Sequence, residues 1–350
     1  MRPRSKDVAI LAGVSAATVS HVMNGTRFVS PATRERVLAA VTQLGYSSNA
    51  VARSLRRGRT GLLALVVTDI ENPFCTRLAR CVADAAFERG YQVILGDTGE
   101  RADRERWLLE SFRQQHVDGV ILAPSRDSHQ HVDVLRQLDI PIVLVNRSLE
   151  GVDVPHVVSD SVLAGRMSAE YLIGQGHHRI GIVQGYVDVT STTRQRLEGI
   201  RLALSNCGLT LKEDLVACGD FTVDGGRVAL TELMRRDSTP TAVIVMEKYM
   251  AVGVLLGLKD LSLRCPEDVE VVSFGDPDAV LAPNPVLTIV RQPIEEMAKK
   301  AVALMLDRVE GLDSGASAML EPTLIVRGSP VSRTHQLVSA RLAPMGVVSD

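Results

Sequence analysis

The sequence lacks the features of a secreted, membrane-spanning or metal-binding chain. No apolar run reaches the roughly 18 residues that a membrane-spanning helix requires. The five cysteines are an odd number without metal-like spacing, which favours free thiols in a reducing compartment. The first residues, Met-Arg-Pro-Arg-Ser-Lys, contain no apolar signal core. These absences predict a cytoplasmic protein with no membrane partner and no metal site.

Catalytic motifs are missing as well. The sequence contains no Gly-x-Gly-x-x-Gly after a strand pattern, no Gly-x-x-x-x-Gly-Lys-Ser/Thr loop and no Gly-x-Ser-x-Gly elbow. His177 and His178 are adjacent, so they cannot lie on one helix face as a pair of metal ligands would. Their position at a helix-to-strand turn predicts a helix-capping or surface role. We therefore expect that the protein is not an enzyme and that it holds no cofactor.

Acidic residues are scarce in one part of the chain. Residues 1–60 contain ten Lys or Arg but only two acids, Asp7 and Glu35. The remaining residues hold 29 basic and 39 acidic side chains, so a head of charge +8 precedes a body of charge −10. A basic head on an acidic body is typical of a nucleic-acid-binding module joined to a different kind of domain. The alternative, a solvated basic terminus, would lack helical periodicity.

The basic head has the pattern of short helices. Val8, Leu11 and Ala12 follow helical spacing, and Gly13-Val14 predicts a turn. Ser15 can cap a second helix over residues 16–23, whose apolar face carries Val19, Val22 and Met23. Its opposite face carries small or hydrogen-bonding side chains: Ala17, Thr18 and His21. Two short helices joined by a tight turn, the second with such a face, fit the major groove of duplex DNA.

Two more helices are predicted before residue 60. Ser30-Pro31 marks the start of a third helix, whose packing edge consists of Val37, Val41 and Leu44 and whose end is Gly45. Residues 49–57 form a fourth helical stretch with almost no core of its own. Such a short helix is unstable in isolation, so it needs a partner or DNA to fold.

Beyond residue 60 the chain alternates apolar strands with amphipathic helices. Continuous apolar runs, typical of buried parallel strands, occur at residues 62–67, 91–95, 119–123, 142–145, 179–183, 241–246 and 269–274. Helical patterns lie at residues 76–89, 103–116, 128–138, 162–175, 193–207, 224–235 and 250–258. We expect two doubly wound, parallel α/β lobes that join near residues 157–161 and 288–292. A small-molecule enzyme or a transporter's solute-binding protein is the alternative on such a core.

Polar residues follow the predicted strands. Ligands of open parallel sheets bind outside the carboxyl ends of the strands. In the first lobe those ends carry Asp69, Asn72, Phe74, Ser125, Asn146 and Arg147, and in the second they carry residues 185–196, Glu247, Lys248 and Asp276. This set suits a small hydroxylated or charged molecule. Asp69, Ser125 and Lys248 fit a loop-capping role equally well.

Spaced motifs recur along nearly the whole chain. In the head they are residues 6–9 (Lys-Asp-Val-Ala), 12–15 (Ala-Gly-Val-Ser), 18–20, 22–25, 44–46 and 49–55. In the body they are residues 72–74 (Asn-Pro-Phe), 117–119, 176–180, 196–199, 266–269 and 291–293. With these motifs the chain resembles the lactose-repressor/galactose-repressor family of bacterial transcription regulators. Within the head, His21 and residues 26–28 are most similar to the purine repressor.

The resemblance implies an all-α helix-turn-helix head and a two-lobed α/β core like that of periplasmic binding proteins. The DNA-binding domain would span residues 1–48, and a hinge helix and linker residues 49–60. The effector-binding and dimerisation domain would span residues 61–330, with lobe one at 61–158 and 292–320, lobe two at 159–291 and 321–330, and a tail at 331–350. The implied partners are a near-palindromic DNA operator, a small-molecule effector and a second copy of the chain.

The resemblance also assigns DNA contacts in the head. Ala17, Thr18 and His21 would meet base edges, and Arg27 would reach DNA just beyond the recognition helix. Phosphate contacts, which position the module without reading sequence, are expected at Ser5, Ser15, Ser20, Asn24, Ser30 and Tyr46. A capping role would explain Ser15 and Ser30 by itself.

In the predicted hinge helix, Leu55 matches a leucine that family members wedge into the central base step from the minor groove. Such a wedge unstacks and kinks the duplex. Asn49, Arg53 and Arg56 would contact DNA around it, and the arginines would neutralise phosphates. The alternative is that Leu55 packs on the α/β body.

In the core, Arg196 and Asp276 match family contacts to the effector. An arginine fork beside a carboxylate can grip vicinal hydroxyls or a charged head group. The other expected contacts are Phe74, Ser125, Asn146, Arg147, Thr192, Phe221 and Glu247. Glu247-Lys248 stands where most sugar-responsive members have Asn-Asp, and Arg147 replaces an aromatic residue of the purine repressor. Both changes add charge to the pocket, which disfavours a plain neutral sugar and disfavours a purine more strongly. A sugar or sugar derivative remains the expected effector.

Closure of the lobes around an effector would change the spacing of the two hinge helices in a dimer. A ligand shifts such an equilibrium only by its difference in affinity between the two states, so an inducer and a co-repressor are both compatible with the sequence. Residues 328–350 lack a sustained heptad of leucines. We therefore expect a homodimer rather than a tetramer.

Overall fold

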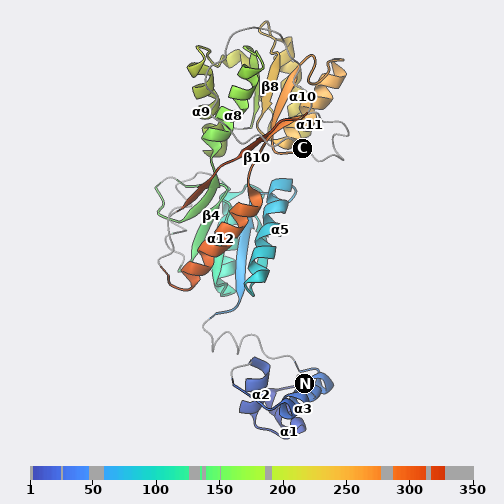
Figure 1. The fold of residues 1–350 in the computed structure, drawn as a ribbon, viewed down its shortest axis with the longest axis vertical. Helices are drawn as coiled ribbons and strands as arrows, with labels where there is room; N and C mark the ends of the chain where they lie inside the picture. The colour runs from blue at the N-terminus through green and yellow to red at the C-terminus, as the bar shows by residue number, and fades with distance from the viewer. Residues whose placement is uncertain are drawn as a thin grey trace. The chain divides into compact units, whose positions relative to one another are not determined.

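The computed structural model describes residues 3–24, 27–46, 59–125, 135, 139–149, 151–185, 191–276, 287–312 and 317–327. The chain forms two units, Met1–Leu62 and Leu63–Asp350 (Figure 1). The predicted hinge helix at residues 49–57 and almost all of the helix predicted at 128–138 lie outside the described residues. No helix among the residues described is long and apolar enough to cross a membrane.

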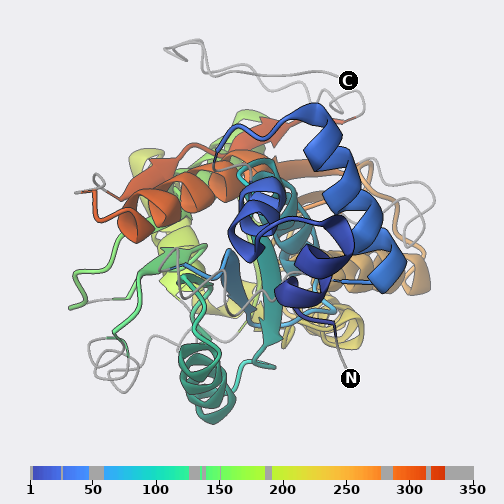
Figure 2. The same cartoon turned by 90° about the horizontal axis from the view of Figure 1, so that it is seen from below.

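The N-terminal unit contains α1 (Ser5–Ala12), α2 (Ala16–Asn24) and α3 (Pro31–Leu44), seen in blue in Figure 2. Their shared core contains Val8, Val19, Val22 and Val37. The turn between α1 and α2 depends on Gly13, whose φ of 62° is left-handed and disfavours other residues. The prediction for α1 was partly wrong: Leu11 is 46% exposed, whereas Ala9 is 6% exposed and packs into the core.

The first lobe of the second unit contains a six-stranded sheet in the order β11-β5-β4-β3-β1-β2. The strands are β1 (Leu62–Val67), β2 (Gln92–Asp97), β3 (Gly119–Leu122), β4 (Ile142–Val145), β5 (His156–Ser159) and β11 (Ala318–Leu320). Helices α5 (Pro73–Glu88) and α12 (Ile294–Val309) lie side by side against this sheet (Figure 1), and α6 (Ala102–Gln114) follows β2. A Cβ atom on Gly119 would lie 2.2 Å from Met305 Sδ, so a larger residue there would force the Met305 side chain of α12 to move.

The second lobe contains a six-stranded sheet in the order β12-β10-β9-β8-β6-β7. The strands are β6 (Ile180–Gln184), β7 (Val216–Cys218), β8 (Ala242–Val245), β9 (Glu270–Phe274), β10 (Thr288–Arg291) and β12 (Thr323–Ile325). The helices are α8 (Ser161–Gly174), α9 (Ser191–Asn206), α10 (Val223–Arg235) and α11 (Lys248–Asp260), with a 3₁₀ turn at Glu213–Leu215. A Cβ on Gly165 would lie 2.0 Å from the carbonyl oxygen of Arg196, so α8 and α9 pack in direct backbone contact.

The chain passes between the two sheets three times. It crosses from β5 to α8, returns from β10 to α12, and crosses again from β11 to β12. The prediction of two doubly wound lobes is confirmed, with one difference: β12 pairs antiparallel with β10 at the edge of the second sheet. The sequence pattern missed β5, β7, β10, β11 and β12, because none of these three- or four-residue strands is a sustained apolar run.

Candidate functional site

The head presents the predicted recognition face on α2. Ala17 is exposed and Thr18 and His21 are partly exposed, while Val19 and Val22 on the opposite face are buried. This arrangement leaves one side of α2 available to a groove of DNA.

The serines that precede the head helices are engaged in capping. Ser15 Oγ accepts a 3.1 Å hydrogen bond from the amide of Thr18, and Ser30 Oγ accepts one of 3.4 Å from the amide of Thr33. Both serines remain exposed, as does Arg27. The remaining predicted contacts that the structure describes, Ser5, Ser20 and Tyr46, are partly exposed. The side chains of Asn24, Asn49, Arg53, Leu55 and Arg56 lie outside the described part.

The predicted effector contacts lie at the carboxyl ends of strands in both sheets. In lobe one, Ser125 follows β3, Asn146 and Arg147 follow β4, and Phe74 lies in the first turn of α5. In lobe two, Thr192 and Arg196 belong to α9, Phe221 follows β7, Glu247 follows β8 and Asp276 follows β9. Hydrogen bonds join these edges: Tyr249 Oη donates to the carbonyl of Glu71 at 2.8 Å, and Gln292 Nε2 donates to Asn146 Oδ1 at 3.4 Å.

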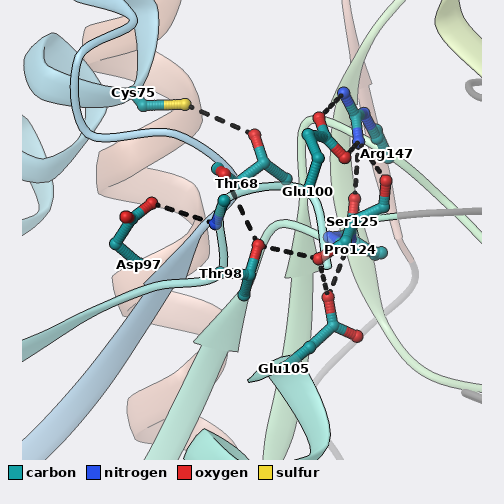
Figure 3. A network of polar contacts seen from close by, with 10 residues as sticks. Thr68, Cys75, Asp97, Thr98, Glu100, Glu105, Pro124, Ser125 and Arg147 are labelled. Carbon is teal, nitrogen blue, oxygen red and sulfur yellow. Dashed lines mark hydrogen bonds and ion pairs between the residues drawn. The ribbon is translucent and has the colours of Figure 1, made fainter. Parts of the chain in front are cut away.

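Arg147 is held inside lobe one by a network of polar contacts (Figure 3). Its Nη1 and Nη2 donate to the two carboxylate oxygens of Glu100 at 3.1 and 2.8 Å. Nη1 also donates to the carbonyl oxygens of Pro124 and Ser125 at 2.8 and 2.9 Å. The Arg147 side chain is 11% exposed. The guanidinium group thus links the ends of β3 and β4. Its Nε is buried and has no hydrogen-bond partner among the described residues.

Ser125 is fully buried in the same network. Its hydroxyl donates to Glu105 Oε2 at 2.6 Å and contacts Thr98 Oγ1 at 2.8 Å, while its amide donates to Glu105 Oε2 at 2.7 Å. Figure 3 shows Glu105 reaching this loop from α6. These contacts correspond to the loop-capping role that the sequence left open for Ser125.

In lobe two, Asp276 forms a two-pronged ion pair with Arg327. The distances from Arg327 Nη1 and Nη2 to the two carboxylate oxygens are 2.8 and 2.6 Å, and Arg291 approaches the same carboxylate at 3.7 Å. Arg327 follows β12, so this pair fixes the end of β9 against the segment that follows β12. The sequence did not indicate Arg327, because its partner lies 51 positions earlier.

Arg196 and Glu247 lie near each other in a partly buried environment. Arg196 Nη1 donates to the carbonyl oxygen of Met246 at 2.7 Å, and its guanidinium carbon lies 4.4 Å from the centre of the Phe274 ring. Glu247 Oε2 caps α11 by accepting from the amides of Tyr249 and Met250 at 2.6 and 3.2 Å. Burial lowers the pKa of Arg196 to about 10 and raises the pKa of the Glu247 carboxyl.

Two residues of the predicted site have left-handed backbone conformations. Phe221 has a φ of 66° and Asn146 a φ of 68°. The Phe221 ring lies directly over Gly185, where an added Cβ would meet its Cζ at 1.9 Å. Thr192 is partly exposed at the start of α9. Strain of this kind concentrates at ligand-contacting loops.

His177 is a correction to the sequence interpretation. It is 4% exposed and so not a surface residue, whereas its amide does cap the end of α8 by donating to the carbonyl oxygen of Leu172 at 3.0 Å. Its Nε2 hydrogen-bonds to Glu270 Oε2 at 3.0 Å and its Nδ1 to Thr241 Oγ1 at 2.9 Å. Tyr171 Oη donates to the other Glu270 oxygen at 2.7 Å. This cluster lies at the amino ends of β8 and β9, away from the predicted effector contacts.

Two protein-family models match the chain. The model described as "Periplasmic binding proteins and sugar binding domain of LacI family" matches residues 60–315, and "Bacterial regulatory proteins, lacI family" matches residues 6–49. The chain belongs to the LacI family. It is a DNA-binding transcriptional regulator, as the sequence motifs predicted.

Similar bacterial proteins include repressors of transcription. The ribose operon repressor of Escherichia coli is 35% identical over 93% of this chain and 98% of its own length. Catabolite control protein A of Priestia megaterium is 35% identical over 85% of this chain and 90% of its own length. The HTH-type transcriptional repressor PurR of Vibrio atlanticus is 33% identical over 88% of this chain and 92% of its own length.

Solved structures give the same result. The complex of the transcriptional regulator CelR with cellobiose has a TM-score of 0.70 and 35% identity, and the match covers 93% of this chain and 99% of that chain. The Lac repressor dimer bound to operator and the anti-inducer ONPF has a TM-score of 0.84 at 24% identity over 93% and 98% of the two chains. The second likeness shows the shared fold.

Proposed function

We propose that this LacI-family protein is a repressor whose homodimer binds a near-palindromic operator and whose affinity for DNA is controlled by a sugar or sugar derivative. The observation that carries the proposal is the set of polar groups from two lobes at the facing strand ends. Hydrogen bonds from Tyr249 to Glu71 and from Gln292 to Asn146 bridge those ends.

Buried polar atoms without partners support a ligand at this place. Among the described residues they include Arg147 Nε, Ser159 Oγ, Gln184 Oε1 and Arg196 Nε. All four residues lie at or just beyond the carboxyl end of a strand or in the helix that follows one. Because an unsatisfied buried polar atom is costly, a hydroxylated solute or ordered water would stabilise these groups. The set contains donors and acceptors, as does a sugar.

Control of DNA binding follows from the two-lobed construction. The three crossings between the sheets permit a hinge, and a solute held from both lobes favours one arrangement over the other. The head binds DNA through α2, with Thr18 and His21 at base edges, and the predicted hinge helix at residues 49–57 transmits the change. No group of His, Cys, Asp and Glu in the described ranges is arranged to hold a metal ion.

Two measurements test this function. Purified protein is bound to genomic fragments at low and high salt, and we expect site-selective binding that weakens steeply with salt. A thermal-shift screen against sugars, sugar phosphates and nucleobases then identifies effectors, each of which is added to the DNA-binding assay. Arg113→Ala, which removes an exposed charge from α6, is a control that should leave operator affinity unchanged. Absence of any site-selective fragment would contradict the proposal.

A further inference from the structure

The charged side chains at the strand ends are mostly matched with a partner of opposite charge. Arg147 forms its two-pronged pair with Glu100 in lobe one, and Arg327 forms one with Asp276 in lobe two. Planar guanidinium and carboxylate groups that meet in this way use each other's charge and most of each other's hydrogen-bonding positions. These two pairs therefore have little charge to offer a solute.

Arg196 differs from these arginines. Its contacts among the described residues are one carbonyl, that of Met246, and the face of the Phe274 ring. Its Nε is buried and has no hydrogen-bond acceptor among the described residues. The residue as a whole keeps partial exposure, so a solute can reach it. Within the part of the chain that the structure describes, Arg196 is thus a partly buried cation with an unfilled donor and no carboxylate bound to its fork.

Glu247 does not supply the missing charge directly. Its Oε2 accepts from two amides at the start of α11. Burial and the positive charge of Arg147 lower the pKa of Arg196, whereas the negative charge of Glu247 raises it. The pKa of Arg196 still falls to about 10. Burial of the cation is the main cause of this shift, and the nearby carboxylate offsets it only in part.

A neutral hydroxyl would accept a hydrogen bond from Nε but would leave the charge of Arg196 uncompensated. A carboxylate or phosphate does both, because its oxygens match the geometry of the guanidinium fork. Among the described residues, Gln184 Oε1 and Ser159 Oγ at the ends of β6 and β5 are also buried without a hydrogen-bond partner. We propose that the effector is an anionic sugar derivative, a sugar acid or sugar phosphate, whose negative group binds Arg196. This inference rests on the proposed function.

The first test uses inorganic phosphate as the probe and the full-length protein. Melting temperatures are measured in phosphate and in chloride at equal ionic strength. We expect phosphate to raise the melting temperature of the wild type by about 3 °C more than that of Arg196→Gln. Phosphate also stabilises proteins generally by exclusion from their surface, so only the difference between variants is informative. The control is Arg194→Gln, which removes an exposed charge two residues away and should behave as the wild type.

The second test compares matched probes on the wild type alone, so it does not depend on the folding of a variant. The pairs are glucose with gluconate, glucose with glucose 6-phosphate, and ribose with ribose 5-phosphate. We expect at least one anionic member to bind at least tenfold more tightly than its neutral partner in calorimetry. Preference for carboxylate or for phosphate then identifies the anion. Arg196→Lys should bind the preferred anion more weakly than the wild type because the ammonium lacks the fork.

Two results would overturn the inference. One is an equal effect of phosphate on the wild type and Arg196→Gln, and the other is tighter binding of neutral sugars than of their anionic partners. Operator binding without additives is measured on the same samples. Loss of that binding would refute the proposed function, whereas normal operator binding with a neutral effector would refute only the anionic class.

Discussion

The phenol of Tyr249 donates a 2.8 Å hydrogen bond to the carbonyl oxygen of Glu71. Tyr249 lies in the first turn of α11 in lobe two, and Glu71 follows β1 in lobe one. The bond therefore joins the two lobes near the carboxyl ends of their strands. It favours the arrangement in which the lobes are close.

Tyr249→Phe should loosen this arrangement without unfolding either lobe. A net hydrogen bond contributes about 1 kcal/mol, so its loss should change the equilibrium between lobe arrangements about fivefold. We expect small-angle X-ray scattering of the ligand-free protein to give a larger radius of gyration. The melting temperature, measured on the same samples, should stay close to that of the wild type. A scattering curve identical to the wild type's would mean that the bond has no effect on the lobes.

Arg147→Met should destabilise the protein by about 3 kcal/mol. The substitution keeps the apolar stem but leaves Glu100 and the carbonyl oxygens of Pro124 and Ser125 without their donor. Urea unfolding measures the change. Arg101→Met, which breaks the exposed pair with Asp103, is the matched control and should have no measurable effect. Equal results for the two substitutions would show that Arg147 is not structural.

Substitution of the two adjacent histidines by alanine should change the free energy of unfolding by very different amounts. His177→Ala removes the partner of Glu270 inside lobe two and should lower the free energy of unfolding by about 3 kcal/mol. His178→Ala removes an exposed ring and should change it by less than about 0.5 kcal/mol. Chemical unfolding followed by circular dichroism distinguishes them. A mild effect of His177→Ala would contradict the role of the buried cluster.

The buried position of His177 illustrates what the sequence could and could not predict. Central strands such as β1 and β4 were predictable because continuous apolar runs report burial on both faces locally. The burial of His177 was not, because its partner Glu270 is 93 residues away and a pairing at that distance leaves no local pattern. The motif at residues 176–180 marked the segment without indicating its chemistry.

The same limit applies to the candidate site. Strand ends indicated the candidate effector contacts, but charge pairing decides which of them keep hydrogen-bonding groups available to a ligand. Arg147 has its partner Glu100 47 residues earlier, and Asp276 has Arg327 51 residues later. Sequence alone does not distinguish the chemistry of Arg147, Arg196 and Arg327. Only the packing of loops from different strands shows that Arg147 and Arg327 are paired with carboxylates among the described residues, in contrast to Arg196.

Glu247→Gln should make the stability of the protein less dependent on pH. Burial raises the pKa of the Glu247 carboxyl above its ordinary value of 4.5, so the folded protein keeps this proton to higher pH than the unfolded chain. The resulting stability is complete below pH 4.5 and is lost as the pH rises through the folded-state pKa. The glutamine oxygen can still cap α11 but does not ionise. Raising the pH from about 4 to about 7 should therefore cost the wild type more melting temperature than Glu247→Gln.

The control for this experiment is Glu213→Gln, which alters an exposed glutamate in the 3₁₀ turn. Its pH profile should follow that of the wild type. If the wild type instead gained stability relative to Glu247→Gln as the pH rose, the carboxylate charge at the start of α11 would outweigh burial, and the pKa would be shifted downward.

Leu55→Ala should weaken operator binding strongly while leaving effector binding intact. If Leu55 wedges into the central base step, its loss removes the kink that lets the dimer wrap the duplex. An apolar wedge releases no counterions, so the slope of log affinity against log salt should not change. Arg56→Ala should instead reduce that slope by about one, because it removes a phosphate contact. Fluorescence anisotropy over a salt series separates the two effects. Unchanged affinity of Leu55→Ala for a palindromic site would reject the wedge and favour packing of Leu55 on the α/β body.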